Sequence, residues 1–156
     1  MLDMLVLRDA RETDVDAMVE LLQQLFAIEA DFSPRPEKQR RGLTLMLARP
    51  EHAKLLVAEI AGRVAGMLTA QVLVSTGEGE RVALLEDMVV DAAHRGHGIG
   101  GALLGAMEAW ATESGFPRLQ LLADRENAPA LEFYRRHHWS QTQLVAWRKH
   151  PAPAAD

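Results

Sequence analysis

Seven consecutive residues in the second half of the chain combine a cation with four glycines: Arg95, Gly96, His97, Gly98, Ile99, Gly100 and Gly101. Glycine loses more conformational freedom on folding than other residues. A run this rich in glycine therefore indicates a backbone that turns sharply or approaches a ligand closely. The apolar spacing that follows is typical of a helix, and a helix start favours an anion through its free N–H groups and its dipole. Because the guanidinium of Arg95 suits phosphate geometry, we predict a pyrophosphate-binding turn.

Two other interpretations of this turn remain open on the residues alone. Residues 96–101 also fit the dinucleotide-binding pattern G-x-G-x-x-G, and Asp124 lies near the place where a ribose-binding carboxylate is expected. Residues 91–95, however, separate the predicted strand from the first glycine, whereas the dinucleotide turn follows its strand directly. The turn could also be a helix cap that binds nothing, although one or two glycines would suffice for that. A Walker A site is excluded, since no Gly-Lys-Ser/Thr follows.

Two carboxylates and one phenol are the other candidates for chemistry. Glu86 and Asp87 lie inside an apolar run, where a carboxylate is costly unless it is paired or functional. As neighbours on a strand they should face opposite sides. Burial would raise the pKa of Glu86 and make it a better base, and a buried salt bridge is the alternative. Tyr134 is the only tyrosine, and it could donate a proton or serve as a core aromatic.

Composition narrows the classes of function. The chain has 156 residues, 48% of them apolar and 25% charged, which fits one soluble domain with a real core. Its net charge of −5 argues against nucleic-acid binding. No cysteine is present, so a cysteine nucleophile is excluded, and the histidine spacing fits no metal site. We find no apolar run of membrane-spanning length and no signal peptide, and we therefore expect a cytoplasmic protein without membrane contact.

The elements that must position these residues follow from hydrophobic periodicity. Short connections join the three strands in the middle of the chain, which predicts an antiparallel meander. The strand–helix–strand pattern after it predicts parallel strands in one mixed α/β sheet. We expect a single domain over residues 1–149 and a disordered tail over residues 150–156. The predicted strands are 4–8, 54–60, 64–75, 82–90, 118–123 and 141–147, and the predicted helices are 14–30, 37–48, 98–113 and 127–137.

Arg95, Gly98 and Gly100 fit Arg/Gln-x-x-Gly-x-Gly/Ala, the hallmark motif of the GNAT family of N-acetyltransferases. The chain resembles this family over residues 4–147, most strongly over 85–139. Residues 85–90 and 127–136 resemble its polyamine (spermidine/spermine) branch. The resemblance implies a mixed, mostly antiparallel sheet with a splayed parallel strand pair and about four helices. It also implies acetyl-coenzyme A as the donor and a homodimer as the assembly.

The resemblance assigns a role to each matching residue. The pyrophosphate would bind residues 95–101, and Asn127, which could equally be a helix N-cap, would contact the pantetheine arm. Tyr134 would protonate the departing thiolate. Glu86 would help to deprotonate the amine through water, or attract a cationic substrate together with Asp87. The pantetheine arm would bind to the backbone of Met88, Val89 and Val90. Asp31 and Phe32 lie where this family builds its acceptor pocket.

These residues together predict direct acetyl transfer to a primary amine of a small molecule, in a ternary complex. Since the chain has no cysteine, the acetyl group cannot pass through an enzyme thiol first. The alternative is a non-catalytic sensor or scaffold that binds acetyl-coenzyme A on the same fold. One departure from the family pattern is His138-Trp139, where Gly-Phe or Gly-Ala is common. The resemblance therefore does not predict the backbone geometry at the end of the helix that carries Tyr134.

Overall fold

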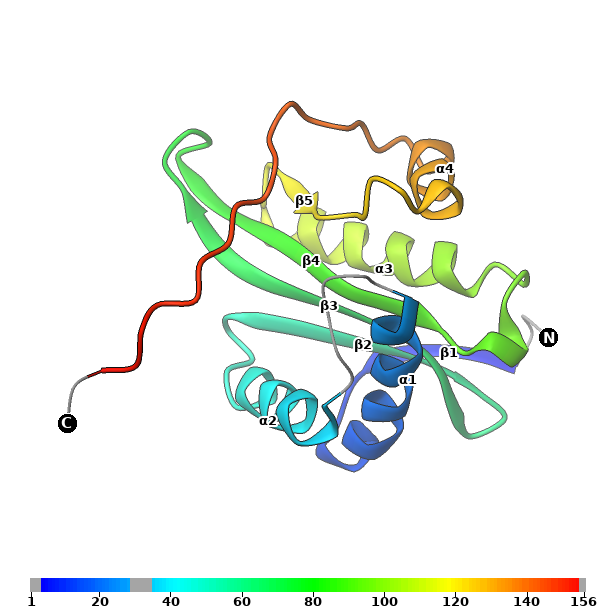
Figure 1. The fold of residues 1–156 in the computed structure, drawn as a ribbon. Coiled ribbons are helices and arrows are strands. Elements are labelled where there is room, and N and C mark those ends of the chain that lie inside the picture. The colour runs from blue at the N-terminus through cyan, green and yellow to red at the C-terminus, as the bar shows by residue number, and fades with distance from the viewer. Residues whose placement is uncertain (1–3, 29–34, 155–156) are drawn as a thin grey trace. The chain divides into compact units, whose positions relative to one another are not determined.

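The computed structural model describes residues 4–28 and 35–154. The chain divides into two compact units, Met1–Leu121 and Leu122–Asp156. The first unit holds a five-stranded sheet, and the second holds one helix and segments without regular structure. Figure 1 follows the chain through these elements.

The sheet has the strand order β1-β2-β3-β4-β5, in which each strand pairs with its neighbours in sequence. The first three pairings are antiparallel, and β4 pairs with β5 in parallel. This confirms the predicted mixed sheet, because the short turns between β2, β3 and β4 allow only antiparallel neighbours. The strands are β1 (Leu5–Asp9), β2 (Ala53–Ile60), β3 (Arg63–Ser75), β4 (Glu80–Val90) and β5 (Leu119–Leu121).

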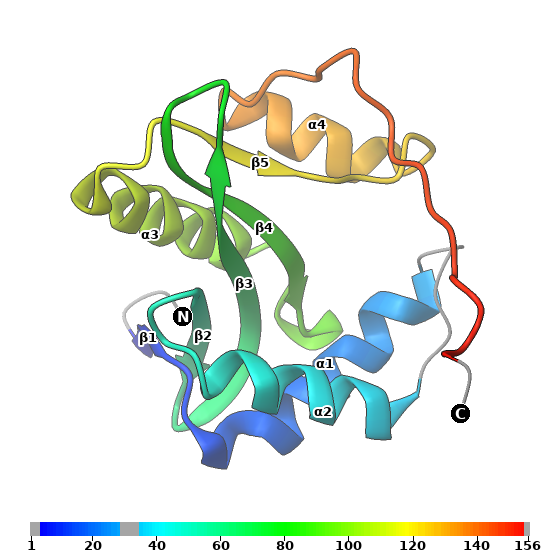
Figure 2. The same ribbon diagram turned by 90° about the vertical axis from the view of Figure 1, so that its left-hand side faces the viewer.

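Helices cover both faces of this sheet. Helices α1 (Val15–Ile28) and α2 (Pro36–Leu47) lie on one face, and α3 (Ile99–Ser114) lies on the other (Figure 1 and Figure 2). Coverage on both sides explains why six of the eight residues of β2 are buried without alternation. On the α3 side the buried residues are Ile99, Leu103, Leu104, Met107 and Ala111, at helical spacing.

A partly buried ion-pair network fixes the entry into α1. Arg8 on β1 makes a bidentate pair with Asp14, with N–O distances of 2.7 and 2.9 Å, and its Nε donates to Glu59 at 2.8 Å. Asp14 also accepts the backbone N–H of Arg11 at 2.7 Å, so a short 3-10 helix, η2 (Glu12–Asp14), precedes α1. The arginine lowers the pKa of Asp14 through these hydrogen bonds. The carboxylate of Asp14 therefore caps the start of η2 by accepting the backbone N–H of its first flanking residue.

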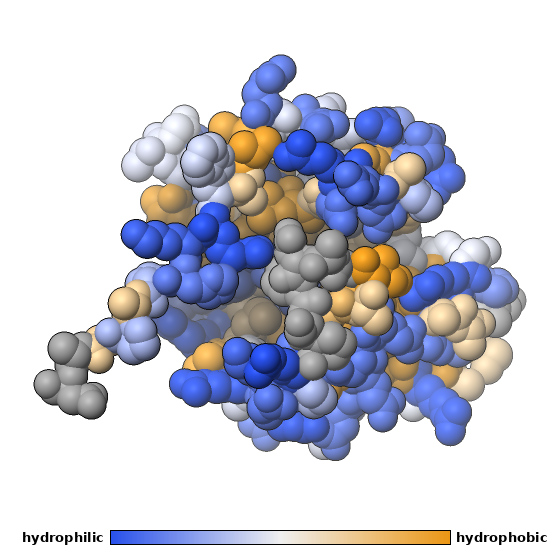
Figure 3. Space-filling model, in the orientation of Figure 1, coloured by the Kyte–Doolittle hydropathy of each residue, from blue (hydrophilic) through white to orange (hydrophobic). Residues whose placement is uncertain are grey.

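The second unit contains α4 (Ala128–Arg136). The predicted strand over residues 141–147 is wrong for the structure: the segment has no regular structure and takes part in none of the sheet's pairings, and a strand exists only where its backbone groups pair with a neighbour. The predicted strand 118–123 shortens to three residues for the same reason, since its pairing with β4 ends at Leu121. Hydrophilic residues predominate on the face of the molecule in Figure 3, and hydrophobic ones form small separate groups.

Candidate functional site

The glycine-rich turn joins β4 to α3 through a short 3-10 helix, η3 (Ala92–His94). Gly96 and Gly98 have φ values of +81° and +80°, in the left-handed region that other residues adopt only at a cost. A Cβ built on either glycine meets nothing within 4 Å, so the space beside the turn is open. The first helical hydrogen bond runs from the N–H of Ala102 to the carbonyl of Gly98 at 3.0 Å. The earlier N–H groups of the helix therefore precede its hydrogen-bond ladder and are available to an anion.

The start of the turn is anchored to α1 by Gln24. Its Nε2 donates to Asp91 Oδ1 at 2.9 Å, and its Oε1 accepts the N–H of Ala92 at 3.1 Å. His94 Nδ1 lies 3.2 Å from the other carboxylate oxygen of Asp91. The hydrogen bond from Gln24 lowers the pKa of Asp91, and His94 lowers it further. The carboxylate of Asp91 therefore stays ionised and holds the turn to α1, which lies on the face of the sheet opposite to α3.

Two further hydrogen bonds tie the turn to the strands β3 and β4. The N–H of Asp91 donates to the carbonyl of Ala65 on β3 at 2.8 Å. The side chain of Arg95 folds back, and its Nε donates to the carbonyl of Val90 at 3.1 Å. Arg95 is exposed, so the other N–H groups of its guanidinium can donate hydrogen bonds to a phosphate at the turn.

The first turns of α3 lie very close to the sheet at Gly66 of β3. A Cβ at Gly66 would stand 3.2 Å from a methyl carbon of Leu103 and 3.3 Å from one of Ile99. The absence of a side chain thus lets the helix approach the strand at this point. This close contact determines where the helix start, with its free N–H groups, stands relative to β4.

A β-bulge interrupts β4 at the candidate carboxylates. Thr69 of β3 pairs with Glu86 and Met67 pairs with Val89, so Leu68 alone opposes two residues of β4. Asp87 has a φ of +54°, and the buried hydroxyl of Thr69 donates to the carbonyl of Glu86 at 3.0 Å. The expectation that Glu86 and Asp87 face opposite sides presumes a regular strand, and the bulge removes that regularity at Asp87.

The parallel pair of strands separates at the same place. Strand β4 pairs with β5 only through residues 83–85 and 119–121, and residues 86–90 continue without a strand on that side among the described residues. Apart from the carbonyl of Val90, which accepts Nε of Arg95, the backbone edge from Met88 to Val90 is thus open to another hydrogen-bonding partner. This is the splayed arrangement expected for the pantetheine arm, and it adjoins the glycine-rich turn directly.

Glu86 stands at the point of separation. Its side chain keeps solvent exposure, yet partial burial raises the pKa of its carboxyl above the usual value. Burial penalises the charged form of a carboxyl and so makes the carboxylate a stronger base. No salt bridge to Glu86 exists among the described residues, which removes the buried-ion-pair alternative within that part of the chain.

Asn127 and Tyr134 belong to the second unit. Asn127 is the N-cap of α4, since its Oδ1 accepts the N–H of Ala130 at 3.3 Å. This confirms the capping interpretation of Asn127 and leaves its contact with a cofactor as a prediction. Tyr134 lies on α4, with its ring centroid 5.3 Å from that of Phe133 and 6.2 Å from that of Trp139.

The end of α4 is a Schellman motif built without glycine. The N–H of Trp139 donates to the carbonyl of Tyr134 at 3.0 Å, and the N–H of His138 donates to that of Arg135 at 3.0 Å. His138 has a φ of +67° in the position where glycine is usual. The contact between the rings of Trp139 and Tyr134 is the hydrophobic contact that accompanies such caps. The motif therefore holds the backbone and the ring of the candidate acid.

Sequence reasoning missed Gln24 and Gly66. The partners of Gln24 are 67 and 68 positions away, and helical periodicity alone marks it only as a polar residue of an amphipathic helix. An isolated glycine inside the apolar run of β3 was the available signal for Gly66. Of the predicted acceptor residues, Asp31 and Phe32 lie outside the described residues.

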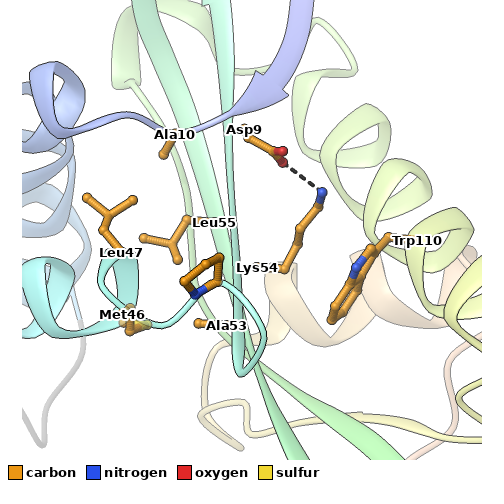
Figure 4. Close-up of a pocket in the computed structure, with 9 residues that line it drawn as sticks. Asp9, Ala10, Met46, Leu47, Ala53, Lys54, Leu55 and Trp110 are labelled. Atoms are coloured by element: carbon orange, nitrogen blue, oxygen red, sulfur yellow. Dashed lines mark ion pairs between the residues drawn. The ribbon is translucent and has the colours of Figure 1, made fainter.

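A separate pocket of about 290 Å³ lies in the first unit, where the end of α2, the start of β2 and Trp110 of α3 meet. Figure 4 shows Lys54 between Asp9 and the indole of Trp110, with Lys54 Nζ 2.7 Å from Asp9 Oδ1. None of the predicted site residues lines this pocket. Its lysine is already paired, and its remaining lining is largely apolar, so it does not compete with the glycine-rich turn as the candidate site.

Two other kinds of site find no support among the described residues. No three histidine or acidic side chains in residues 4–28 and 35–154 come together as they would around a metal ion. In the same part of the chain, no helix combines the length and the apolar character that crossing a membrane requires.

Comparison with known proteins gives a match to a family model. Residues 15–139 match the model described as the acetyltransferase (GNAT) family. An uncharacterized N-acetyltransferase of Methanocaldococcus jannaschii is 26% identical over 140 residues, which cover 89% of this chain. The chain spans 62% of the length of that relative.

Solved structures share the fold. An aminoglycoside acetyltransferase from an uncultured soil metagenomic sample, in complex with sisomicin, superposes with a TM-score of 0.77 at 23% identity, covering 96% of this chain and 98% of that one. A predicted acetyltransferase of Clostridium acetobutylicum, solved with acetyl-coenzyme A, has a TM-score of 0.75 at 19% identity, covering 94% and 96%. At these identities the likeness shows the fold.

Proposed function

Because the chain belongs to the acetyltransferase (GNAT) family, we propose that it transfers an acetyl group from acetyl-coenzyme A to a primary amine of a small molecule. The observation that carries the proposal is the turn over residues 95–101. It presents open space, two left-handed glycines and the free N–H groups of α3 beside the unpaired edge of β4. A second solved relative of this fold contains acetyl-coenzyme A, which supports the choice of donor.

The residues of the first unit fit such a donor. The N–H groups of Ile99, Gly100 and Gly101 would hold the pyrophosphate together with the guanidinium of Arg95. The pyrophosphate would lie close to the backbone of Gly96, His97 and Gly98, since the two glycines have no Cβ that would keep it away. The backbone edge at Met88, Val89 and Val90 would bind the pantetheine arm, and we propose that Asn127 contacts the same arm.

When bound, acetyl-coenzyme A would supply the acetyl group as an activated thioester. We assign to Glu86 the removal of the proton from the amine, through water, because its raised pKa makes its carboxylate a stronger base than that of an ordinary glutamate. We assign to Tyr134 the proton that the leaving sulfur takes up, since a phenol with a pKa of about 10 can protonate a thiolate as it forms. The new N–C bond forms directly, because the chain holds no cysteine to carry the acetyl group.

A cationic amine is the acceptor class we favour. Glu86 and Asp87 lie together at the bulge, and a carboxylate attracts an ammonium group before its deprotonation. The net charge of −5 fits a cationic partner and disfavours nucleic acid. The related aminoglycoside acetyltransferase was solved with sisomicin, which supports a small-molecule amine. Polyamines remain part of the same proposal, as do the acceptor roles of Asp31 and Phe32, and we propose a homodimer as the assembly.

The test combines binding with turnover. Calorimetry should show binding of acetyl-coenzyme A, and release of coenzyme A should depend on an added amine from a panel of polyamines and aminoglycosides. Tyr134→Phe keeps the ring and its contacts but removes the proton, so turnover should fall by about 100-fold or more while binding is kept. Binding without turnover for any amine would favour a sensor or scaffold of the same fold. Absence of binding at millimolar acetyl-coenzyme A would contradict the proposal.

A further inference from the structure

The pocket beside Lys54 combines two opposite charges with apolar walls. Lys54 Nζ lies 2.7 Å from Asp9 Oδ1, and the side chain of Asp9 is 69% exposed. The other side chains that line the pocket are apolar, among them Leu47 and Trp110. The volume of about 290 Å³ is at the lower end of the range for ligand pockets, so a ligand smaller than a typical drug molecule would fit.

The backbone of Ala53 adds a donor and an acceptor to this pocket. Strand β1 pairs with β2 as far as Asp9 and Leu56, and the N–H of Ala10 then donates to the carbonyl of Leu55 at 2.9 Å. Backbone groups alternate between the two sides of an antiparallel strand, so Ala53 directs its N–H and C=O to the same side as Leu55. Among the described residues, no strand lies opposite Ala53 on that side. Both groups can therefore bind a ligand in the pocket.

One wall of the pocket is an aromatic ring held in place by a second ring. The indole of Trp110 packs edge to face against Phe116, with ring centroids 5.2 Å apart and an interplanar angle of 87°. Figure 4 shows this indole beside the side chain of Lys54. A ring fixed in this way offers apolar surface to a ligand at little further cost in side-chain entropy. The pocket thus suits a ligand with an apolar part next to its charged groups.

We propose that this pocket binds a free α-amino acid with an apolar side chain. The ammonium and carboxylate of such a molecule are attached to one carbon atom, so they can lie head to tail against the carboxylate of Asp9 and the ammonium of Lys54. A lysine ammonium has three N–H donors, and the contact with Asp9 leaves some of them for the carboxylate of the ligand. The N–H of Ala53 would donate to the same carboxylate, and the C=O of Ala53 would accept from the ammonium.

The walls and the ion pair together select this class of ligand. The side chain of the amino acid would lie against Trp110 and Leu47, where its apolar area leaves water. A charged side chain would lose its hydration there without a partner of its own. A simple anion would be repelled by Asp9 and a simple cation by Lys54, whereas a zwitterion satisfies both. The proposal does not depend on acetyl transfer, since none of the residues assigned to that reaction lines the pocket.

Calorimetry on the protein without acetyl-coenzyme A is the first test. We expect L-leucine to bind at millimolar concentration, with one molecule per chain. N-acetyl-L-leucine lacks the ammonium and L-leucinamide lacks the carboxylate, so each should bind at least about 10-fold more weakly, as for the loss of a hydrogen bond to a charged group. L-Glutamate should also bind more weakly, because its side chain is charged. Absence of L-leucine binding, or equal binding of all four compounds, would overturn the proposal.

Substitutions then locate the site in the chain. Lys54→Met keeps the length of the side chain but removes its charge, and Asp9→Asn removes the opposite charge. Each should weaken L-leucine binding at least about 10-fold. Lys38→Met, at an exposed position of α2 outside the pocket, is the matched control and should bind like the wild type. Circular dichroism checks that each variant folds, and the comparison of compounds tests the same contacts in the unaltered protein.

A last variant separates this pocket from the acceptor site, where an amino acid could also bind through its amine. Glu86→Gln should leave the affinity for L-leucine unchanged, because Glu86 does not line the pocket. Binding that Glu86→Gln removes and Lys54→Met retains would place the amino acid at the acceptor site and overturn the proposal.

Discussion

Gln24 holds both residues that begin the glycine-rich turn, through hydrogen bonds of 2.9 Å to Asp91 and 3.1 Å to Ala92. Gln24→Leu removes both bonds and leaves the turn tied only to the strands β3 and β4. With a net value of roughly 1 kcal/mol for a hydrogen bond, the KM for acetyl-coenzyme A should rise about 5- to 10-fold with little change in kcat.

Its neighbour provides the control for this measurement. Gln23 lies on the same helix but its side chain bonds to Gln39 at 3.3 Å and not to the turn. Gln23→Leu should therefore leave the KM for acetyl-coenzyme A unchanged, and direct binding of coenzyme A by calorimetry should follow the same pattern. Equal effects of the two substitutions would contradict a positioning role for Gln24.

Glu86 should govern the acid side of the pH profile. Its raised pKa means that the carboxyl keeps its proton to a higher pH than an ordinary glutamate. Activity that needs the carboxylate is therefore lost as pH falls through this raised pKa. The same shift has the opposite effect on folding, because the native state binds the extra proton. The free energy of unfolding contributed by Glu86 should fall as pH rises through the interval between the two pKa values.

The measurement is kcat/KM against pH for the wild type and for Glu86→Gln. The variant should lose most of its activity. Its pH profile should also lose the fall on the acid side that is due to Glu86, while any fall due to protonation of the amine substrate persists. Glu80→Gln on the same strand is the control and should reproduce the wild-type profile. An unchanged acid limb in Glu86→Gln would assign the base to another group.

The sequence indicated these reactive residues by type and order but not their geometry. The glycines of the turn indicate a sharply turning backbone, and the left-handed φ values of Gly96 and Gly98 agree with this indication. The bulge at Asp87 was not predictable, since it depends on how β3 pairs with β4 and no residue of β4 marks it. Gln24 was hidden because its partners are distant in sequence and close only after folding.

At the scale of elements, the cap of α4 contains a residue under conformational strain. His138 adopts a φ of +67° where glycine would cost little. His138→Gly should relieve about 1 kcal/mol, and hydrogen exchange of the α4 amides should then slow by roughly five-fold. His137→Gly is the contrast, because the φ of His137 is −95°; glycine there relieves no strain, adds freedom to the unfolded chain and removes the contacts of the imidazole with Phe133, so exchange should become faster. Faster exchange in His138→Gly would show that the histidine makes a compensating contact.

Periodicity predicted most elements to within two residues, because each buries one apolar stripe or face. The failures occurred where an element needs a partner. Strand β5 is shorter than expected since only three of its residues pair with β4, and residues 141–147 form no strand in this chain. A strand is defined by its neighbour, and a single sequence does not specify which residues supply that neighbour.

At the scale of the whole molecule, the proposed homodimer links stability to concentration. Unfolding of a dimer also separates its two chains, so the Tm should rise by a few degrees for each tenfold increase in protein concentration. Scanning calorimetry over a hundredfold range in concentration measures this dependence. A Tm that stays constant over that range would contradict the homodimer.

The close approach of α3 to β3 at Gly66 has a consequence for the thermodynamics of binding. Because the start of the helix packs closely against the strand, the N–H groups that would face an anion are held by a tightly packed part of the chain. A receptor that is already ordered loses little entropy when its ligand arrives. The packing of α3 against Gly66 of β3 thus orders the anion-binding N–H groups before the ligand binds, and this order contributes to the affinity.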